Sequence, residues 1–430
     1  MNIRDLRRRA AVALAALLAV GTVAAGAPAV AAPASSAGPT TTPFTTPNTD
    51  NCPQQTLPPP PIDLSEVPKP GQPTPKPLPV PDPPVGGKRL GACGVVVPKG
   101  APPVPAEISA TSWMVSDMET GQVLAAKDPH GRYRPASTIK VLLATVALRT
   151  LNLDTVVTGT QADADVDGTR VGIGPGGRYT NRQLMQALIM ASGNDAAHAI
   201  AAQLGGDDAA VAKMNELARS LRALDTRAAT PSGLDGPGMS TSAYDLSLLF
   251  REAMTIPLFA ELIHTEQIDF PGYPADPRIP EDKDHPGFPV GNDNHLLYNY
   301  EGALGGKTGF TDDARQTYVA AAERGGRTLI VTLLKADVLP IRPWEQAARL
   351  LDYGFALDAD ASVGALPGPD TEAEPTGVAL AAPPQGSEVG HLAQSQGGPD
   401  RDDLRWVLVA GGGIMVLVLL AGARRIIRRR

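Results

Sequence analysis

The stretch Arg134–Lys140, which reads RPASTIK, opens an apolar, helix-like run that continues to Leu148. Ser137 and Lys140 are three residues apart within it, and on a helix this spacing places both side chains on one face, one turn apart. A serine hydroxyl becomes a strong nucleophile when a nearby base takes its proton, and an uncharged lysine amine can act as that base. Burial and a second cation are the usual causes of the lowered pKa that this requires, and Lys307 is our candidate for the second cation.

The Ser-x-x-Lys spacing also arises by chance in a chain of 430 residues, where it would mark an exposed lysine in the first turn of an ordinary helix. Two further motifs favour a catalytic site. Ser192–Asn194 (SGN) falls between two predicted helices, where its side chains can point into a cleft, although a plain helix break with an asparagine N-cap has the same pattern. Lys307–Gly309 (KTG) lies on a predicted strand; a lysine and a hydroxyl suit a carboxylate, whereas an edge-strand lysine often serves only solubility.

The order of the predicted elements indicates one α+β domain with an antiparallel sheet. Alternating strand patterns come first, at 112–117 and 122–126, and a block of helices follows. Thr180 and Gln183 have capping-box spacing at the start of one of these helices. The helix that Thr180 caps is predicted to end near 190. Further helices are predicted from Asn194 or Asp195 to 205, from Asp207 or Asp208 to 221, and from 243 to 254. The later predictions are a surface loop at 270–294, strands at 302–309, 317–322 and 328–334, and a helix from Pro343 to Gly354.

The residues before this domain divide into two segments. Residues 1–31 combine arginines, an apolar run and a small-residue end, which is the pattern of a secretory signal peptide. Residues 32–106 hold about half of the chain's 43 prolines, so we expect an extended, polyproline-like linker outside the cytoplasm. Cys52 and Cys93 are the only cysteines, and export favours a disulfide between them over two free thiols.

The residues after the domain, which we place at 107–358, predict a membrane anchor. We expect 359–404, rich in Ala, Pro, Gly and acids, to be a disordered linker. Residues 406–423 form an uncharged apolar run long enough to span a bilayer, the alternative being a buried helix, and the arginines of 424–430 predict a cytoplasmic tail. The domain would then lie outside the cell membrane on a single span. The net charge of −7 disfavours nucleic acid as a partner, and the six histidines show no metal-ligand spacing, so we expect no metal or cofactor.

In combination, the three motifs resemble those of the penicillin-binding protein and serine β-lactamase superfamily. Within it the chain is similar to the low-molecular-mass D-alanyl-D-alanine carboxypeptidases over roughly 104–358. The strings that carry this closer resemblance are Ser192–Asn194 (SGN), Pro231–Leu234 (PSGL), Asn294–Leu297 (NHLL) and Gly306–Thr311 (GKTGFT). The resemblance implies a β-lactamase/transpeptidase-like α+β fold, with an antiparallel five-stranded sheet and a helical subdomain.

The resemblance also implies a role for each matching residue. Ser137 would be the acylated nucleophile, Lys140 its base, and Ser192 the relay that passes a proton to the leaving amine. The implied substrate-binding residues are Asn194 for an amide carbonyl, Lys307 and Thr308 for the terminal carboxylate, Gly309 for close approach of the substrate backbone, Phe310 with Ser137 for the oxyanion hole, and, from spacing alone, Arg342 for the carboxylate.

The implied reaction removes the terminal D-alanine from a peptidoglycan stem peptide through an acyl-enzyme, and β-lactams would acylate the same serine. Three alternatives stay open: a D,D-endopeptidase or transpeptidase that uses the same residues, a β-lactamase, and a non-enzymatic wall-binding module. A β-lactamase is disfavoured because the chain lacks a Glu-x-x-Leu-Asn string. Two features depart from the family: Ala314-Arg315 replaces a common Ala-Gly and could narrow or recharge the cleft, and a disordered segment replaces a β-rich second domain.

Overall fold

An antiparallel sheet forms the centre of the computed structural model, which describes residues 44–368. Its strands are β1 (Val95–Val96), β2 (Ser112–Asp117), β3 (Gln122–Lys127), β8 (Ala303–Thr311), β9 (Arg315–Arg324), β10 (Arg327–Ala336) and β11 (Gly364–Ala365). Their order is β1-β3-β2-β10-β9-β8, and β11 also pairs with β3. Five long strands therefore form the predicted antiparallel sheet, and two short strands extend it beside β3. The prediction of an α+β fold is confirmed.

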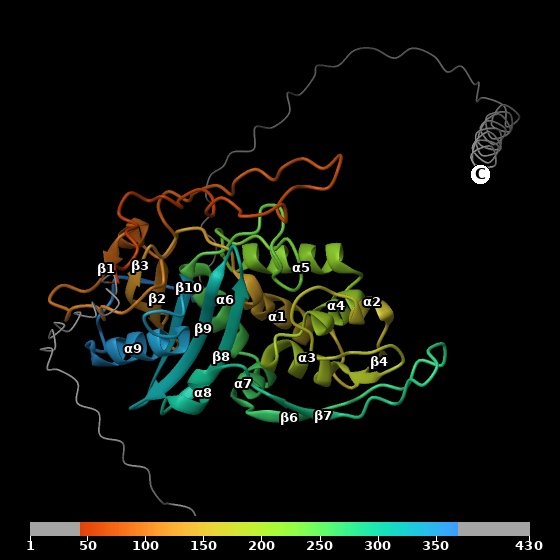
Figure 1. The fold of residues 1–430 in the computed structure, drawn as a ribbon. Helices are drawn as coiled ribbons and strands as arrows, with labels where there is room; N and C mark the ends of the chain where they lie inside the picture. The colour runs from red at the N-terminus through yellow and green to blue at the C-terminus, as the bar shows by residue number, and fades with distance from the viewer. Residues whose placement is uncertain (1–43, 369–430) are drawn as a thin grey trace, which may run out of the picture. The chain divides into compact units, whose positions relative to one another are not determined.

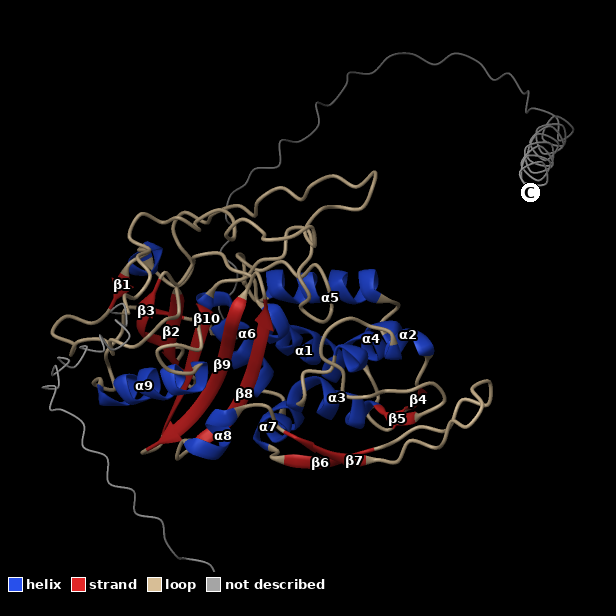
Figure 2. Cartoon of the chain, in the orientation of Figure 1, coloured by secondary structure: helices blue, strands red, loops and turns tan. Residues whose placement is uncertain are grey.

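Helices cover both faces of this sheet, as Figures 1 and 2 show. They are α1 (Lys140–Thr150), α2 (Gln161–Ala164), α3 (Asn181–Met190), α4 (Asn194–Gln203), α5 (Asp207–Ser220), α6 (Ala243–Met254), α7 (Pro257–His264), α8 (His295–Asn299) and α9 (Pro343–Ala356). Met114 and Ile330 belong to the core beneath the α1–α7 block, whereas Trp113 and Val331 pack toward α9. Neighbouring strand residues thus alternate between two cores, which explains why these strands are apolar almost throughout.

The sequence located most of these elements, but helices α2, α7 and α8 and strands β1 and β11 were not predicted, and three further regions need correction. Thr180 and Gln183 form the predicted capping box at the start of α3. At α4, however, the N-cap is Gly193 rather than Asn194 or Asp195, because Asn194 is already helical and its side chain serves the site. The loop predicted at 270–294 contains the hairpin β6 (Gln267–Phe270) and β7 (Phe288–Gly291), and the short pair β4 (Val156–Thr158) and β5 (Arg178–Thr180) was not predicted.

The Pro-rich segment 44–98, which we call the strap, packs against the domain. We predicted an extended linker over 32–106, and its described part contradicts this: Figure 1 shows the strap as a red-to-orange chain that runs over the sheet and the helices. The reason lies in the domain, where Arg132 and Arg134 are buried and need acceptors. Strap carbonyl groups provide them, as Thr56 O and Leu78 O do for Arg132 and Pro59 O does for Arg134.

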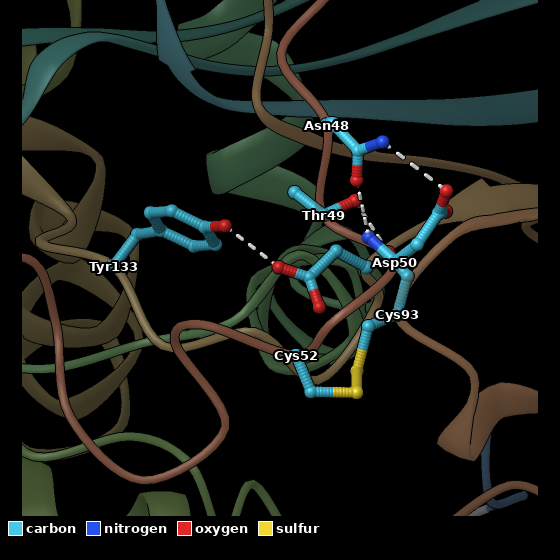
Figure 3. The surroundings of a disulfide bond; sticks show 7 residues. Asn48, Thr49, Asp50, Cys52, Cys93 and Tyr133 are labelled. Carbon is cyan, nitrogen blue, oxygen red and sulfur yellow. Dashed lines mark hydrogen bonds between the residues drawn. A yellow bond between two sulfur atoms is a disulfide. The ribbon is translucent and has the colours of Figure 1, made fainter.

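The strap is closed by a disulfide between Cys52 and Cys93, 41 residues apart in sequence. Figure 3 shows Thr49 beside it, with its hydroxyl donating to Cys93 O at 2.5 Å. Tyr133 of the domain lies near the bridge and donates to Asp128 Oδ2 at 2.6 Å. The predicted pairing of the two cysteines is therefore present, and it joins the two ends of the strap to each other.

The predicted signal peptide (1–31), transmembrane helix (406–423) and basic tail (424–430) lie outside the described residues, as does most of the predicted linker 359–404. Among residues 44–368, no helix has the length and apolar character needed to cross a bilayer. One boundary is corrected: the domain continues past 358, because β11 at Gly364–Ala365 pairs with β3 and Leu366 is buried.

Candidate active site

Ser137 lies in a 3₁₀ turn, Ala136–Ile139, and Lys140 begins α1 directly after it. Ala136 has a φ of 47°, a left-handed conformation that residues with a Cβ rarely adopt. Gly233 fits closely against this turn, since a Cβ there would lie 2.0 Å from Ala136 O. The backbone before the nucleophile is thus held in an uncommon conformation by close packing, a feature typical of functional sites.

Lys140 contacts three oxygen atoms and is completely buried. Its Nζ lies 2.8 Å from Ser137 Oγ, 2.7 Å from Asn194 Oδ1 and 2.5 Å from Ser232 O. The two carbonyl oxygens can only accept hydrogen bonds, so they take the two N–H groups of an uncharged amine. The nitrogen lone pair then faces the Ser137 hydroxyl, which is the arrangement that a general base requires.

The pKa of Lys140 is well below its usual value, first because burial disfavours the ammonium ion and second because Lys307 repels it. The carboxylates of Asp293 and Asp195 oppose this effect. Burial also lowers the pKa of Lys307, but Asp293 raises it, both as a nearby charge and as a hydrogen-bond partner. The two lysines are therefore unequal: Lys140 is the one biased toward the uncharged form.

Strand β8 packs directly against the nucleophile turn. A Cβ at Gly309 would lie 2.8 Å from Ser137 N, and Thr317 on β9 donates to Pro135 O at 2.7 Å. Only glycine fits at this close approach. Phe310 follows on β8, half exposed and paired with Gln316. The structure thus brings the Lys307–Gly309 motif and Ser137 together, as predicted from the sequence.

Ser192 and Asn194 occupy the junction between α3 and α4. Ser192 is buried with a φ of 58°, which turns the chain sharply between the helices. Asn194 accepts from Lys140 and donates its amide to Asp167 O at 2.8 Å. Within residues 44–368 the Ser192 hydroxyl has no hydrogen bond, so its predicted relay role remains a prediction.

A pocket of about 520 Å³ lies beside Thr308 and includes Arg342. Arg342 is the N-cap of α9, and its exposed side chain shares this pocket with the strand that carries the Lys-Thr-Gly motif. Arg342 therefore lies in a pocket beside Thr308, and its role in binding a carboxylate stays a prediction. Arg315, by contrast, binds Asp337 at the surface, at 2.8 Å.

Two site residues were missed. Ser232 supplies a carbonyl to Lys140, and it belongs to the Pro231–Leu234 string, to which we gave no role. Asp293 accepts from the Thr308 hydroxyl at 2.8 Å and lies 3.7 Å from Lys307 Nζ. Its position immediately before the Asn294–Leu297 string was the signal available, but a lone acid has no motif of its own.

The fold and the site together define a class of protein, the serine peptidases with a penicillin-binding fold. The sequence model of the D-alanyl-D-alanine carboxypeptidases of peptidase family S11 matches residues 99–338. The chain is 46% identical to D-alanyl-D-alanine carboxypeptidase DacB2 of Mycobacterium tuberculosis over 275 residues, which cover 63% of this chain and 90% of that protein. The chain belongs to this S11 family.

Solved structures agree with this assignment. A D-alanyl-D-alanine carboxypeptidase from Mycobacterium tuberculosis matches with a TM-score of 0.58 and 46% identity, over 63% of this chain and all of that one. The DD-transpeptidase of Streptomyces K15 matches with a TM-score of 0.55 and 29% identity, over 60% of this chain and all of that one.

Coverage differs among the relatives. The chain is 34% identical to DacD of Escherichia coli over 59% of its own length, but that match covers only 64% of DacD. On this chain, the family match begins at residue 99 and so leaves the strap outside.

Proposed function

We propose that this protein is a serine-type D-Ala-D-Ala carboxypeptidase that removes the terminal D-alanine of a peptidoglycan stem peptide. The observation that carries this proposal is the contact set of Lys140, whose lone pair is directed at Ser137 by two carbonyl acceptors. Family membership supplies the substrate class, because the relatives are named for this reaction.

The proposed reaction has two steps. Lys140 takes the proton of Ser137 as its oxygen attacks the carbonyl between the two D-alanines, and the backbone N–H groups of Ser137 and Phe310 stabilise the oxyanion, each by roughly 3 kcal/mol. The terminal D-alanine leaves with a proton delivered through Ser192. Water, activated by the same lysine, then hydrolyses the ester and restores Ser137.

Release of D-alanine tests the proposal. Purified protein is incubated with a peptide that ends in D-Ala-D-Ala, and free D-alanine is measured. Release by the wild type and none by Ser137→Ala is the expected result. Binding of the peptide without release would favour the wall-binding module, and rapid turnover of penicillin would favour a β-lactamase.

A second candidate activity is cleavage of cross-links between stem peptides. The pocket beside Thr308, at about 520 Å³, has the size of a site for a larger ligand than one D-alanine. A Pseudomonas aeruginosa relative, 30% identical over 223 residues, is named a D-alanyl-D-alanine endopeptidase. Digestion of purified cross-linked dimers, followed by chromatography, distinguishes the two activities by the appearance of monomers.

We also propose that the domain lies outside the cell membrane on a C-terminal anchor. Residues 1–31 and 406–423 support this by composition. Fractionation of cells that express the full chain, or a chain ended at 404, tests it: only the full chain should be recovered with membranes.

A further inference from the structure

Asp293 takes the Thr308 hydroxyl, one of the groups proposed to hold a substrate carboxylate, and places its charge beside Lys307, whose ammonium group donates to Thr308 O at 2.8 Å. Its Oδ2 accepts from Thr308 Oγ1 at 2.8 Å and lies 3.7 Å from Lys307 Nζ. Thr308 and Lys307 belong to the motif that the proposed reaction uses to hold the terminal carboxylate. The side chain of Asp293 is 37% exposed, so a ligand can reach this arrangement from the pocket.

The position of Asp293 is built by its neighbours in the chain. Asn292 is buried and donates to Ile263 O and Thr265 O, at 3.2 and 3.0 Å. Asn294 is fully buried and accepts from the N–H of Leu296 at 3.1 Å. Asp293 itself donates its backbone N–H to Met190 O at 2.9 Å. These contacts fix the backbone on both sides, so the carboxylate is held at Thr308 rather than carried there by a mobile loop.

An incoming carboxylate therefore meets a carboxylate already in place. Two like charges in one pocket repel, and the Thr308 hydroxyl has a single hydrogen to donate. Arg342 lines the same pocket, so a cation remains available there. The geometry makes Asp293 a competitor of the substrate for the Thr308 hydroxyl and for the positive charge of Lys307, which lies 3.7 Å away.

We propose that Asp293 is a specificity-determining residue that lowers the preference of this enzyme for ligands with a free terminal carboxylate. The proposal rests on the proposed function, because the competing group is the carboxylate of the D,D-peptide. A substrate whose terminal group is uncharged does not compete with Asp293 and is not repelled by its charge. The enzyme therefore tolerates amidated or otherwise masked termini better than an enzyme without this acid.

The test compares matched pairs of ligands on Asp293→Asn, which removes the charge and keeps the shape. One pair is a peptide that ends in D-Ala-D-Ala and the same peptide with a C-terminal amide. The other pair is benzylpenicillin and its methyl ester, whose acylation of Ser137 is followed by mass spectrometry. Measurements are made at the acid end of the active pH range, where Lys307 is best kept protonated in both proteins.

We expect the ratio of kcat/KM for the acid to that for the amide to rise roughly ten-fold in Asp293→Asn, which corresponds to about 1.4 kcal/mol. The ratio of acylation rates for penicillin and its ester should rise in the same direction. Asp269→Asn, on an exposed strand residue, removes one charge elsewhere and should leave both ratios unchanged. If both members of each pair change equally, or the ratios fall, Asp293 has no such role.

The penicillin pair also separates the two proposals. It requires only that Ser137 be acylated, so it reports on Asp293 even if the wild type releases no D-alanine from peptides. Asp293→Ala repeats the test with the Thr308 hydroxyl freed. A thermal unfolding curve for each variant shows that the domain is folded at the assay temperature.

Discussion

Two groups of buried basic side chains, Lys140 with Lys307 and Arg132 with Arg134, are used differently by the protein. In the cleft, Lys140 contacts only uncharged oxygens, and Lys307 repels it. Under the strap, Arg132 and Arg134 bind backbone carbonyls together with the carboxylates of Asp225 and Glu66, respectively. All four side chains are almost completely buried.

Counter-charge decides whether a buried basic side chain serves catalysis or only stability. An arginine stays protonated in proteins, so burying one demands acceptors and a counter-charge. A lysine can instead lose its proton when counter-charge is withheld, and it then becomes a base. The two arginines are paired with carboxylates and strap carbonyl groups, whereas the oxygens that contact Lys140 are all uncharged. The predictions below test this comparison in order of expected effect.

The largest effect should come from Lys140→Met, which keeps most of the length of the side chain and removes the base. Acylation by a fluorescent penicillin should slow by roughly 10²- to 10⁴-fold. Lys140→Arg sharpens the comparison, because an arginine cannot surrender its proton and should be equally slow. Labelling of either variant at the wild-type rate would place the base elsewhere. Ser137→Ala, which lacks the nucleophile, gives the background labelling of the assay.

Glu66→Ala should destabilise the domain by about 3 kcal/mol, because it leaves Arg134 buried without its anion. The measurement is the free energy of unfolding in urea. Glu107→Ala is the matched control, since the Glu107–Arg349 pair is about half exposed and should contribute less than about 1 kcal/mol. Equal losses in the two variants would mean that the strap contact adds no more than a surface pair.

Reduction of Cys52–Cys93 should cost about 2–4 kcal/mol, because the bridge closes a long loop. The unfolding temperature is measured with and without reductant, and a Cys52→Ser, Cys93→Ser double variant should not respond to reductant. Below the unfolding temperature, reduction should change penicillin labelling far less than Lys140→Met does. If reduction slows penicillin labelling as much as Lys140→Met does, the strap contributes to catalysis.

The smallest effect concerns pH. Acylation requires uncharged Lys140, so its rate rises as pH increases through the pKa of that lysine. Lys307→Ala removes the repulsion and raises the pKa of Lys140, which should move the acid limb of the pH–rate profile to higher pH. Lys99→Ala, an exposed lysine, should leave the limb in place. If the acid limb of the profile moves to lower pH, or does not move, Lys307 does not lower the pKa of Lys140.

The sequence predicted the five long strands and most helices because their residues follow clear periods and caps, as at Thr180. It failed where tertiary contacts override composition. The strap reads as a free linker because its prolines bury little and donate few hydrogen bonds. The partners that hold it, Arg132 and Arg134, are in another part of the chain, and their demand for acceptors is visible only in the fold.

For the site, residue types and spacing were enough to predict the candidate groups: Ser137 and Lys140 one turn apart, the Ser192–Asn194 junction, and Lys307 on a strand. Folding sets which lysine is biased toward the uncharged form, because Lys140 contacts the carbonyl of Ser232 whereas Lys307 lies 3.7 Å from Asp293. Motifs record the type and spacing of residues. Burial, counter-charge and the direction of a lone pair depend on segments 54 and 92 residues away from Lys140, which only folding brings together.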